Sequence, residues 1–89
     1  MILHIVAIRD IKANVFAQPY FVASIGGAIR SFGDECSRAA PDNIMYNHPH
    51  DFELYKIGTY DDNNGKIEQA AEHQQLAFGG NYTASNKET

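Results

Sequence analysis

Asp51–Gln69 reads DFELYKIGTYDDNNGKIEQ and predicts a β-hairpin, which is the strongest local signal in the chain. Apolar and polar side chains alternate imperfectly over residues 53–60, so we expect a strand that is partly covered on both faces. The Asp-Asp-Asn-Asn-Gly segment that ends at Gly65 then predicts the turn, because glycine adopts the left-handed backbone conformation that a hairpin loop of this length requires. Residues 65–70 are predicted to return as the second strand.

The residues before this hairpin predict two more strands and a helix. Residues 2–9 are dense in aliphatic and β-branched side chains, which is typical of a strand buried on most of both faces. Pro19 lacks a backbone donor, so residues 20–23 are predicted as a short edge strand. Ser24 is the predicted N-cap of a helix over residues 24–38. One side of that helix carries apolar residues at helical spacing, namely Ile25, Ala28, Ile29, Phe32 and Cys36.

The order of these elements predicts one α+β domain over residues 1–71. We expect a small antiparallel sheet of three or four strands with one helix packed on a face. Residues 39–49 carry turn-forming chemistry and are predicted as a loop. Residues 72–89 are rich in Gln, Gly, Asn, Ser and Thr, and they are predicted to form a polar, mobile tail.

Composition and charge limit the class of protein. The chain has 89 residues, with seven Lys and Arg against eleven Asp and Glu, and the net charge of −4 argues against a simple polybasic coat on nucleic acid. A single cysteine excludes an intramolecular disulfide. No apolar run approaches the ~18 residues of a membrane span, so we expect a soluble intracellular protein without a membrane partner. Because so short a chain builds only a thin core, we also expect a homodimer, through edge pairing or a shared sheet.

Nothing in the sequence forms a convincing catalytic or metal site. His48-Pro49-His50-Asp51 brings imidazoles near a carboxylate, but a metal site needs three or four converging ligands, and a turn explains the segment better. The Asp-rich turn fails as a calcium loop because its first position is Tyr60. Cys36 lies on the apolar side of the helix and is predicted as a core residue. Gly26 and Gly27 leave two alternatives open, tight packing or an anion at the helix N-terminus. We therefore expect no enzyme, no cofactor and no metal.

Aromatic residues interleaved with cations point instead to single-stranded nucleic acid. Bases stack on aromatic rings beside a positive groove, at about 1–3 kcal/mol per base. A net acidic chain can supply such a groove if its acids lie elsewhere, and several lie in the hairpin turn and the tail. The alternative is that most phenylalanines, Phe21, Phe32 and Phe52 among them, form the core, with Tyr20, Tyr55 and Tyr60 unassigned. The candidate nucleic-acid-binding residues are Arg9, Lys12, Tyr20, Arg30, Tyr55 and Lys56.

Four segments occur in order over residues 1–70. They are Ala7-Ile8-Arg9-Asp10 with Lys12-Ala13; Gln18-Pro19-Tyr20-Phe21; Ala28-Ile29-Arg30-Ser31-Phe32; and His48-Pro49-His50-Asp51-Phe52-Glu53-Leu54-Tyr55 continued by Ile57-Gly58-Thr59-Tyr60-Asp61-Asp62 and Gly65-Lys66-Ile67. Together these segments resemble the small nonstructural protein of gokushovirus-type microviruses, the single-stranded DNA phages that include those of Chlamydia. The chain departs from that family at His50, where an acidic residue is usual, and in the Gly26-Gly27 pair.

The resemblance implies a phage protein that is made in the bacterial cytoplasm and is absent from the mature virion. It implies a DNA-binding role when genome synthesis shifts from duplex replication to single strands for packaging, and it brings no catalytic residues. Two functional hypotheses follow. The first is a single-stranded DNA-binding or replication-switch factor. The second is an acidic protein–protein adaptor that binds a phage or host replication protein, which the net charge of −4 favours.

Overall fold

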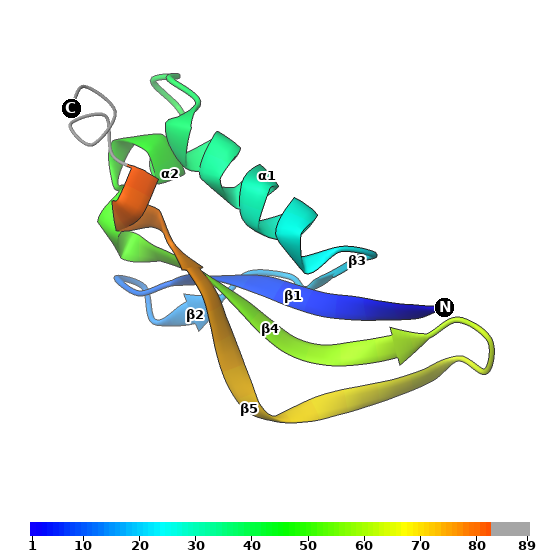
Figure 1. The fold of residues 1–89 in the computed structure, drawn as a ribbon. Helices are drawn as coiled ribbons and strands as arrows, with labels where there is room; N and C mark the ends of the chain where they lie inside the picture. Colours follow the sequence, from blue (N-terminus) through cyan, green and yellow to red (C-terminus); the bar gives the residue numbers. More distant parts are fainter. Residues whose placement is uncertain (83–89) are drawn as a thin grey trace.

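The computed structural model describes residues 1–82 and shows a curled antiparallel sheet with its helices on one side (Figure 1). The elements along the chain are β1 (Ile2–Asp10), β2 (Val15–Phe16), β3 (Tyr20–Val22), α1 (Ile25–Ser37), α2 (Ile44–Asn47), the 3-10 turn η1 (Pro49–Asp51), β4 (Phe52–Asp61), β5 (Lys66–Phe78) and the 3-10 turn η2 (Gly79–Tyr82).

The sheet has the strand order β2-β1-β4-β5, and β3 also pairs with β1. All pairs are antiparallel. β1 pairs with β4 along its whole length, from Ile2 opposite Asp61 to Asp10 opposite Phe52. The predicted α+β class is confirmed, but the sheet has five strands where the sequence predicted three or four. The additional strand is β2, which consists of only two residues and shares one edge of β1 with β3.

The β4–β5 hairpin closes as predicted. Gly65 has a φ of 74°, and its N–H donates to the Asp61 carbonyl over 2.8 Å. β5 then breaks its register. Gln69 lies opposite Gly58 and Gln74 lies opposite Lys56, so residues 70–73 face a single residue of β4. β5 bends at this break and then runs beside β4 toward the helices (Figure 1).

The C-terminal limit of this strand was predicted wrongly. β5 continues to Phe78 and η2 to Tyr82, so residues 72–82 of the expected tail form regular structure. The prediction failed because the Gln-rich second half of β5 lacks the alternation of apolar and polar residues that indicates a strand. Backbone pairing to β4 holds this part of the chain in the sheet. Residues 83–89, the remainder of the predicted tail, lie outside the described residues.

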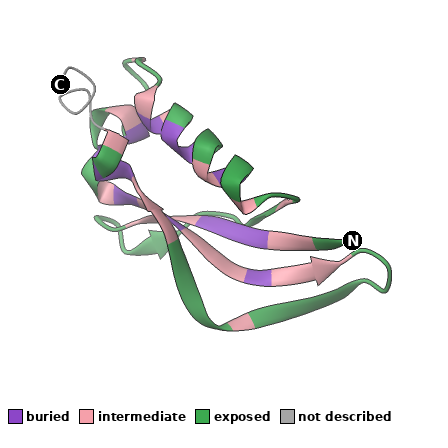
Figure 2. Ribbon diagram, viewed as in Figure 1, coloured by how far each residue is buried: buried purple, intermediate pink, exposed green. Residues whose placement is uncertain are grey.

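The predicted helix is confirmed as α1, with Ser24 as its N-cap. The Ser24 hydroxyl accepts from the Gly27 N–H over 3.1 Å, which satisfies one of the free donors of the first turn. The apolar side of α1 packs against the sheet, and the buried residues lie between these two layers (Figure 2). The buried core cluster consists of Val6, Ala28, Phe32, Cys36, Met45, Phe52 and Leu54.

The expectation of a single packed helix is not confirmed, because the predicted loop contains α2. Asn43 caps α2 through its Oδ1, which accepts from the Met45 N–H over 3.1 Å. The Asn43 Nδ2 donates to the carbonyls of Glu35 and Arg38 over 2.8 and 2.9 Å. These bonds tie α2 to the end of α1 and place Met45 in the core.

Candidate nucleic-acid interface

The two faces of the sheet differ in what covers them. α1 packs over Val6 and Leu54 on one face, whereas no helix of residues 1–82 lies over the other (Figure 1). Side chains alternate between faces along a strand, and directly paired residues share a face. The register and the ring contacts therefore define an open face, formed by Ile5, Ala7, Arg9, Phe16, Phe21, Tyr55, Tyr60, Ile67, Gln69 and His73.

Aromatic rings gather on the open face in two clusters. In the first cluster, the Phe16 ring lies 5.7 Å from Tyr55 and 5.3 Å from His73, between centroids. In the second cluster, Phe21 and Tyr60 lie 5.3 Å apart at an interplanar angle of 74°. Phe16 and Phe21 are 43% and 48% exposed, so the alternative that places Phe21 in the core is wrong for this residue. Edge-to-face pairs of this kind leave ring surfaces available for further stacking.

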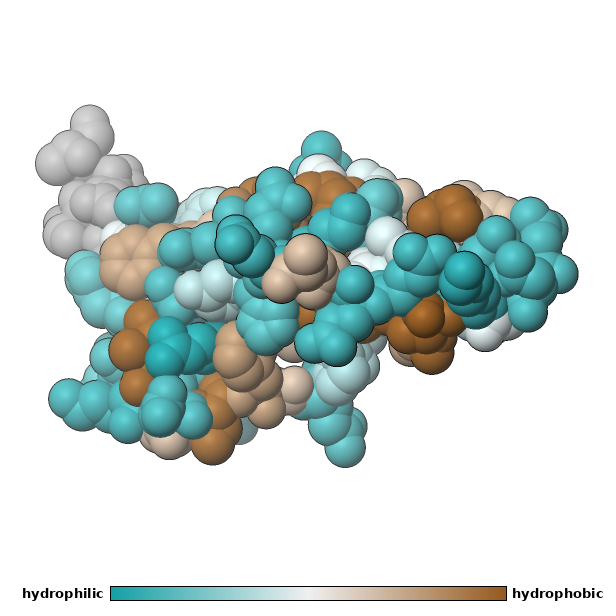
Figure 3. Space-filling view, turned by 90° about the horizontal axis from the view of Figure 1, so that it is seen from below, coloured by the Kyte–Doolittle hydropathy of each residue, from teal (hydrophilic) through white to brown (hydrophobic). Residues whose placement is uncertain are grey.

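A groove of about 280 Å³ lies on the open face, where β5 leaves its register with β4. Its lining is mostly apolar and consists of Ile5, Pro19, Phe21, Ile57, Gly58, Ile67, Glu68, Gln69 and His73. Gly58 is required there, because a Cβ at this position would collide with the carbonyl oxygen of Glu68. The molecule seen from below, the side away from α1, shows hydrophobic patches separated by hydrophilic side chains (Figure 3).

Arg9 is the cation that the register places on the open face. Its guanidinium lies 3.3 Å from a Glu53 carboxylate oxygen and donates to the Asn14 side chain over 2.8 Å. The Tyr55 hydroxyl donates to the same Glu53 oxygen over 3.1 Å. The pKa of Tyr55 is raised by desolvation and by this hydrogen bond. Arg9 is therefore held beside the first aromatic cluster, with part of its charge offset by Glu53.

The other predicted site residues do not join this face. Lys56 and Tyr20 are both paired with Val6, which places them on the side of the sheet that α1 covers. Burial raises the pKa of Tyr20. Arg30 is exposed on α1, and Lys12 is exposed in the turn after β1. Lys12, Arg30 and Lys56 therefore add no positive charge to the open face.

Of the six candidates, the structure brings only Arg9 and Tyr55 together. It adds aromatic residues that the candidate set omitted, namely Phe16, Phe21, Tyr60 and His73. Phe21 could have been found, because it lies in the edge strand that was predicted over residues 20–23. Phe16 could not, because β2 was not predicted. His73 could not have been found, because it lies in the part of β5 that was predicted as tail.

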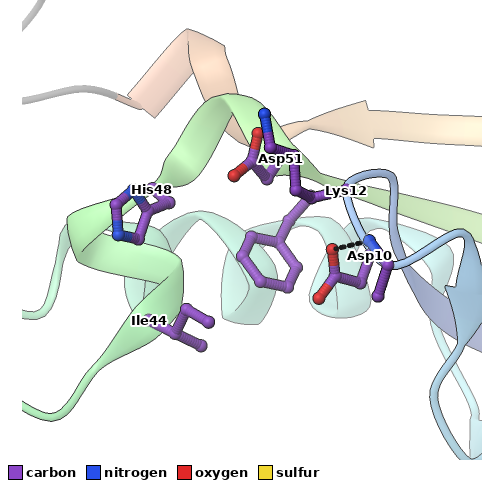
Figure 4. Close-up of a pocket in the computed structure, with 7 residues that line it drawn as sticks. Asp10, Lys12, Ile44, His48 and Asp51 are labelled. Carbon is purple, nitrogen blue, oxygen red and sulfur yellow. Dashed lines mark hydrogen bonds between the residues drawn. The ribbon is translucent and has the colours of Figure 1, made fainter.

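A second hollow, of about 530 Å³, lies at the other end of β1 (Figure 4). Asp10, Lys12, His48 and Asp51 surround it, and the Asp10 carboxylate accepts from the Ala13 N–H over 3.1 Å. The remaining imidazole of the His-Pro-His-Asp segment, that of His50, contacts the Phe78 ring instead.

Residues 1–82 hold no group of three or more His, Cys, Asp or Glu residues that could ligate a metal ion. The helices in that part of the chain are too short or too polar to cross a membrane. Cys36 is buried, and desolvation raises the pKa of its thiol to about 11, so it is a neutral core residue at ordinary pH.

The comparisons with known proteins give one family match. The family model described as Phage ORF5 protein matches residues 3–82, which is most of the chain and all but two of the described residues. Neither a curated protein nor a solved structure matches the chain.

Proposed function

The chain belongs to the Phage ORF5 protein family, and from that membership we propose that it is a non-enzymatic, nonstructural phage protein that binds single-stranded DNA. The proposed site is the open face, and the proposed role is in viral genome synthesis or packaging. We also propose a gokushovirus-type microvirus as its source, on the four sequence segments described above. The protein would then act in the bacterial cytoplasm and be absent from the mature virion.

The observation that carries the DNA proposal is the pair of aromatic clusters on the sheet face that no helix of residues 1–82 covers. Proteins that bind single strands without sequence preference stack successive bases on such rings, and stacking is tolerant of sequence because every base has a π-face. Phe16 and Phe21 are about half exposed and lie on neighbouring segments at one edge of β1. A single strand of DNA that runs along this edge of β1 would reach both aromatic clusters.

The test is titration of a fluorescent oligo-dT at 50 mM salt, followed by anisotropy. We expect binding that Phe16→Leu and Phe21→Leu each weaken by about fivefold or more, since one stacked base contributes about 1–3 kcal/mol. Ile44→Leu is the control, because Ile44 is similarly exposed and lies in α2 beside the other hollow. A protein that is folded by circular dichroism but does not bind at 50 mM salt would contradict the proposal.

A protein–protein adaptor is the second candidate function. It is favoured because most of the candidate cationic residues lie away from the open face. The net charge is −4, and the candidate cations Lys12, Arg30 and Lys56 lie away from the open face. The apolar groove would then hold a side chain of a phage or host replication protein. A pull-down from infected cells separates the two functions: a partner retained after nuclease treatment supports the adaptor, and loss of all partners with nuclease contradicts it.

We also propose that the protein forms a homodimer through β5. β5 is the last strand of the sheet, and its outer edge has no partner strand within residues 1–82. Free N–H and C=O groups on such an edge are a template for another chain, and pairing there would leave the open face accessible. Light scattering should give twice the mass of one chain, and a monomer at 100 µM would contradict the proposal.

A further inference from the structure

The size of the groove on the open face limits what it can hold. Its volume is about 280 Å³, just below the ~300–1,000 Å³ of pockets that take drug-sized ligands. It exists because residues 70–73 bulge away from β4 opposite one residue, while Gly58 lets β5 approach closely beside the bulge. Its dimensions are therefore set by the backbone, and they suit a single ring system.

The lining of the groove suits a neutral aromatic group. Ile5 and Ile57 are apolar, and the rings of Phe21 and His73 each belong to one of the two aromatic clusters. Glu68 is the one charged residue in the lining, and its carboxylate lies 3.5 Å from the Lys66 ammonium. A phosphate group would meet no cation of the lining inside the groove, whereas a base would meet apolar and aromatic surface.

One polar side chain in the lining can read the edge of a base. Gln69 is paired with Gly58, so its side chain emerges on the open face beside the groove. A primary amide offers both a donor and an acceptor, and the edges of the nucleobases carry both. The groove thus combines ring surface with a group that both donates and accepts hydrogen bonds, in a volume of about 280 Å³ that has room for one base.

We propose that this groove is a nucleobase subsite, which takes one base of a single strand while the neighbouring bases stack on the two aromatic clusters. The proposal rests on the proposed DNA-binding function and extends it, because it assigns one position of the strand to an enclosed site. The phosphates of that nucleotide stay outside the groove.

The experiment tests the subsite by introducing a large side chain at an exposed position beside the groove. Gln69→Trp places an indole at the mouth of the groove, and Gln74→Trp is the matched control, because Gln74 is exposed on the same strand but is paired with Lys56 on the other face. We expect Gln69→Trp to weaken oligo-dT binding about tenfold, as loss of one stacked base would, and Gln74→Trp to leave binding unchanged. In the wild type, oligo-dT should shift the NMR signals of the Gly58 amide and the Gln69 side-chain amide.

The outcomes distinguish failure of the nucleobase subsite from failure of the proposed DNA-binding function. If the wild type does not bind oligo-dT, the proposed DNA-binding function fails, and the subsite fails with it. If the wild type binds but both tryptophan variants bind equally well, the subsite is overturned while the DNA-binding function stands. If Gln69→Trp abolishes retention of a nuclease-resistant protein partner and leaves DNA binding intact, the groove holds a partner side chain and the nucleobase proposal is wrong.

Discussion

Gly79 shows how strongly one residue can fix the path of the chain. It begins η2, where the chain turns back after β5, and it is buried against the carbonyl oxygens of Pro49 and Phe52. An added Cβ would collide with the Pro49 carbonyl oxygen, a backbone atom that cannot move aside independently. Gly26 differs, because a Cβ there would meet only the Ser24 hydroxyl oxygen at 3.8 Å.

These two glycines give opposite predictions for the same substitution. Gly79→Ala should lower the free energy of unfolding by about 1–3 kcal/mol, the usual cost of overpacking. Gly26→Ala should raise it by up to about 1 kcal/mol, because alanine favours the helix more than glycine does. Urea unfolding followed by circular dichroism measures both. Equal effects of the two substitutions would mean that η2 does not dock against η1 in solution.

Cys36 predicts a dependence of stability on alkaline pH. Its thiol has a pKa raised from about 9 to about 11 by desolvation, so the folded state keeps the proton longer than the unfolded state. The stabilisation is complete below pH 9 and is lost as the pH rises through 11. The loss should be about 3 kcal/mol, because the pKa shift spans about two units at about 1.4 kcal/mol per unit.

The control for this dependence is Cys36→Ala, which keeps every other titrating group. The difference in unfolding free energy between the wild type and Cys36→Ala should shrink between pH 9 and pH 11, as measured by urea unfolding at each pH. A difference that stays constant over this range would show that the folded thiol titrates at its ordinary pKa.

At the scale of elements, α2 depends on the side chain of one buried residue. Asn43 is 5% exposed and makes three hydrogen bonds, to Met45, Glu35 and Arg38. Asn43→Ala should lower the free energy of unfolding by about 1–3 kcal/mol, because it removes the cap of α2 and takes one donor from each of two part-buried carbonyls. Asn47→Ala is the control. Its exposed side chain makes one bond, to the Pro41 carbonyl, so it should change stability by less than about 0.5 kcal/mol. Equal losses would contradict the role of Asn43.

The elements that could be predicted from the sequence are those whose pattern is local. β1 has a dense aliphatic run, α1 has a cap and an apolar stripe, and the β4–β5 turn has its glycine. β2 and the second half of β5 have no such pattern, because pairing with a distant strand makes them strands. The candidate site failed for a related reason. Alternation along a strand already sends Tyr55 and Lys56 to opposite faces, but pairing with β1 decides that Lys56 takes the face that α1 covers and Tyr55 takes the open face.

At the scale of the whole molecule, the distribution of charge predicts how DNA binding depends on salt. Arg9 is the predicted cation that lies on the open face, and Glu53 offsets part of its charge. For single strands, log K falls with log salt at a slope of about −0.7 per phosphate neutralised. We therefore expect a slope of about −0.7 or shallower, measured by oligo-dT titrations between 50 and 300 mM salt. A slope steeper than about −3 would show that several cations contact the strand.

The core joins residues from distant parts of the chain, and this has a consequence during synthesis. Val6 packs in the same cluster as Leu54, with Leu76 and Tyr82 against it. A ribosome adds about 5–20 residues per second, so β1 leaves the ribosome on the order of ten seconds before the residues that complete its surroundings. Its aliphatic side chains stay exposed to chaperones and to other nascent chains during that interval. The fold therefore closes only after residue 82 has been synthesised and released from the exit tunnel.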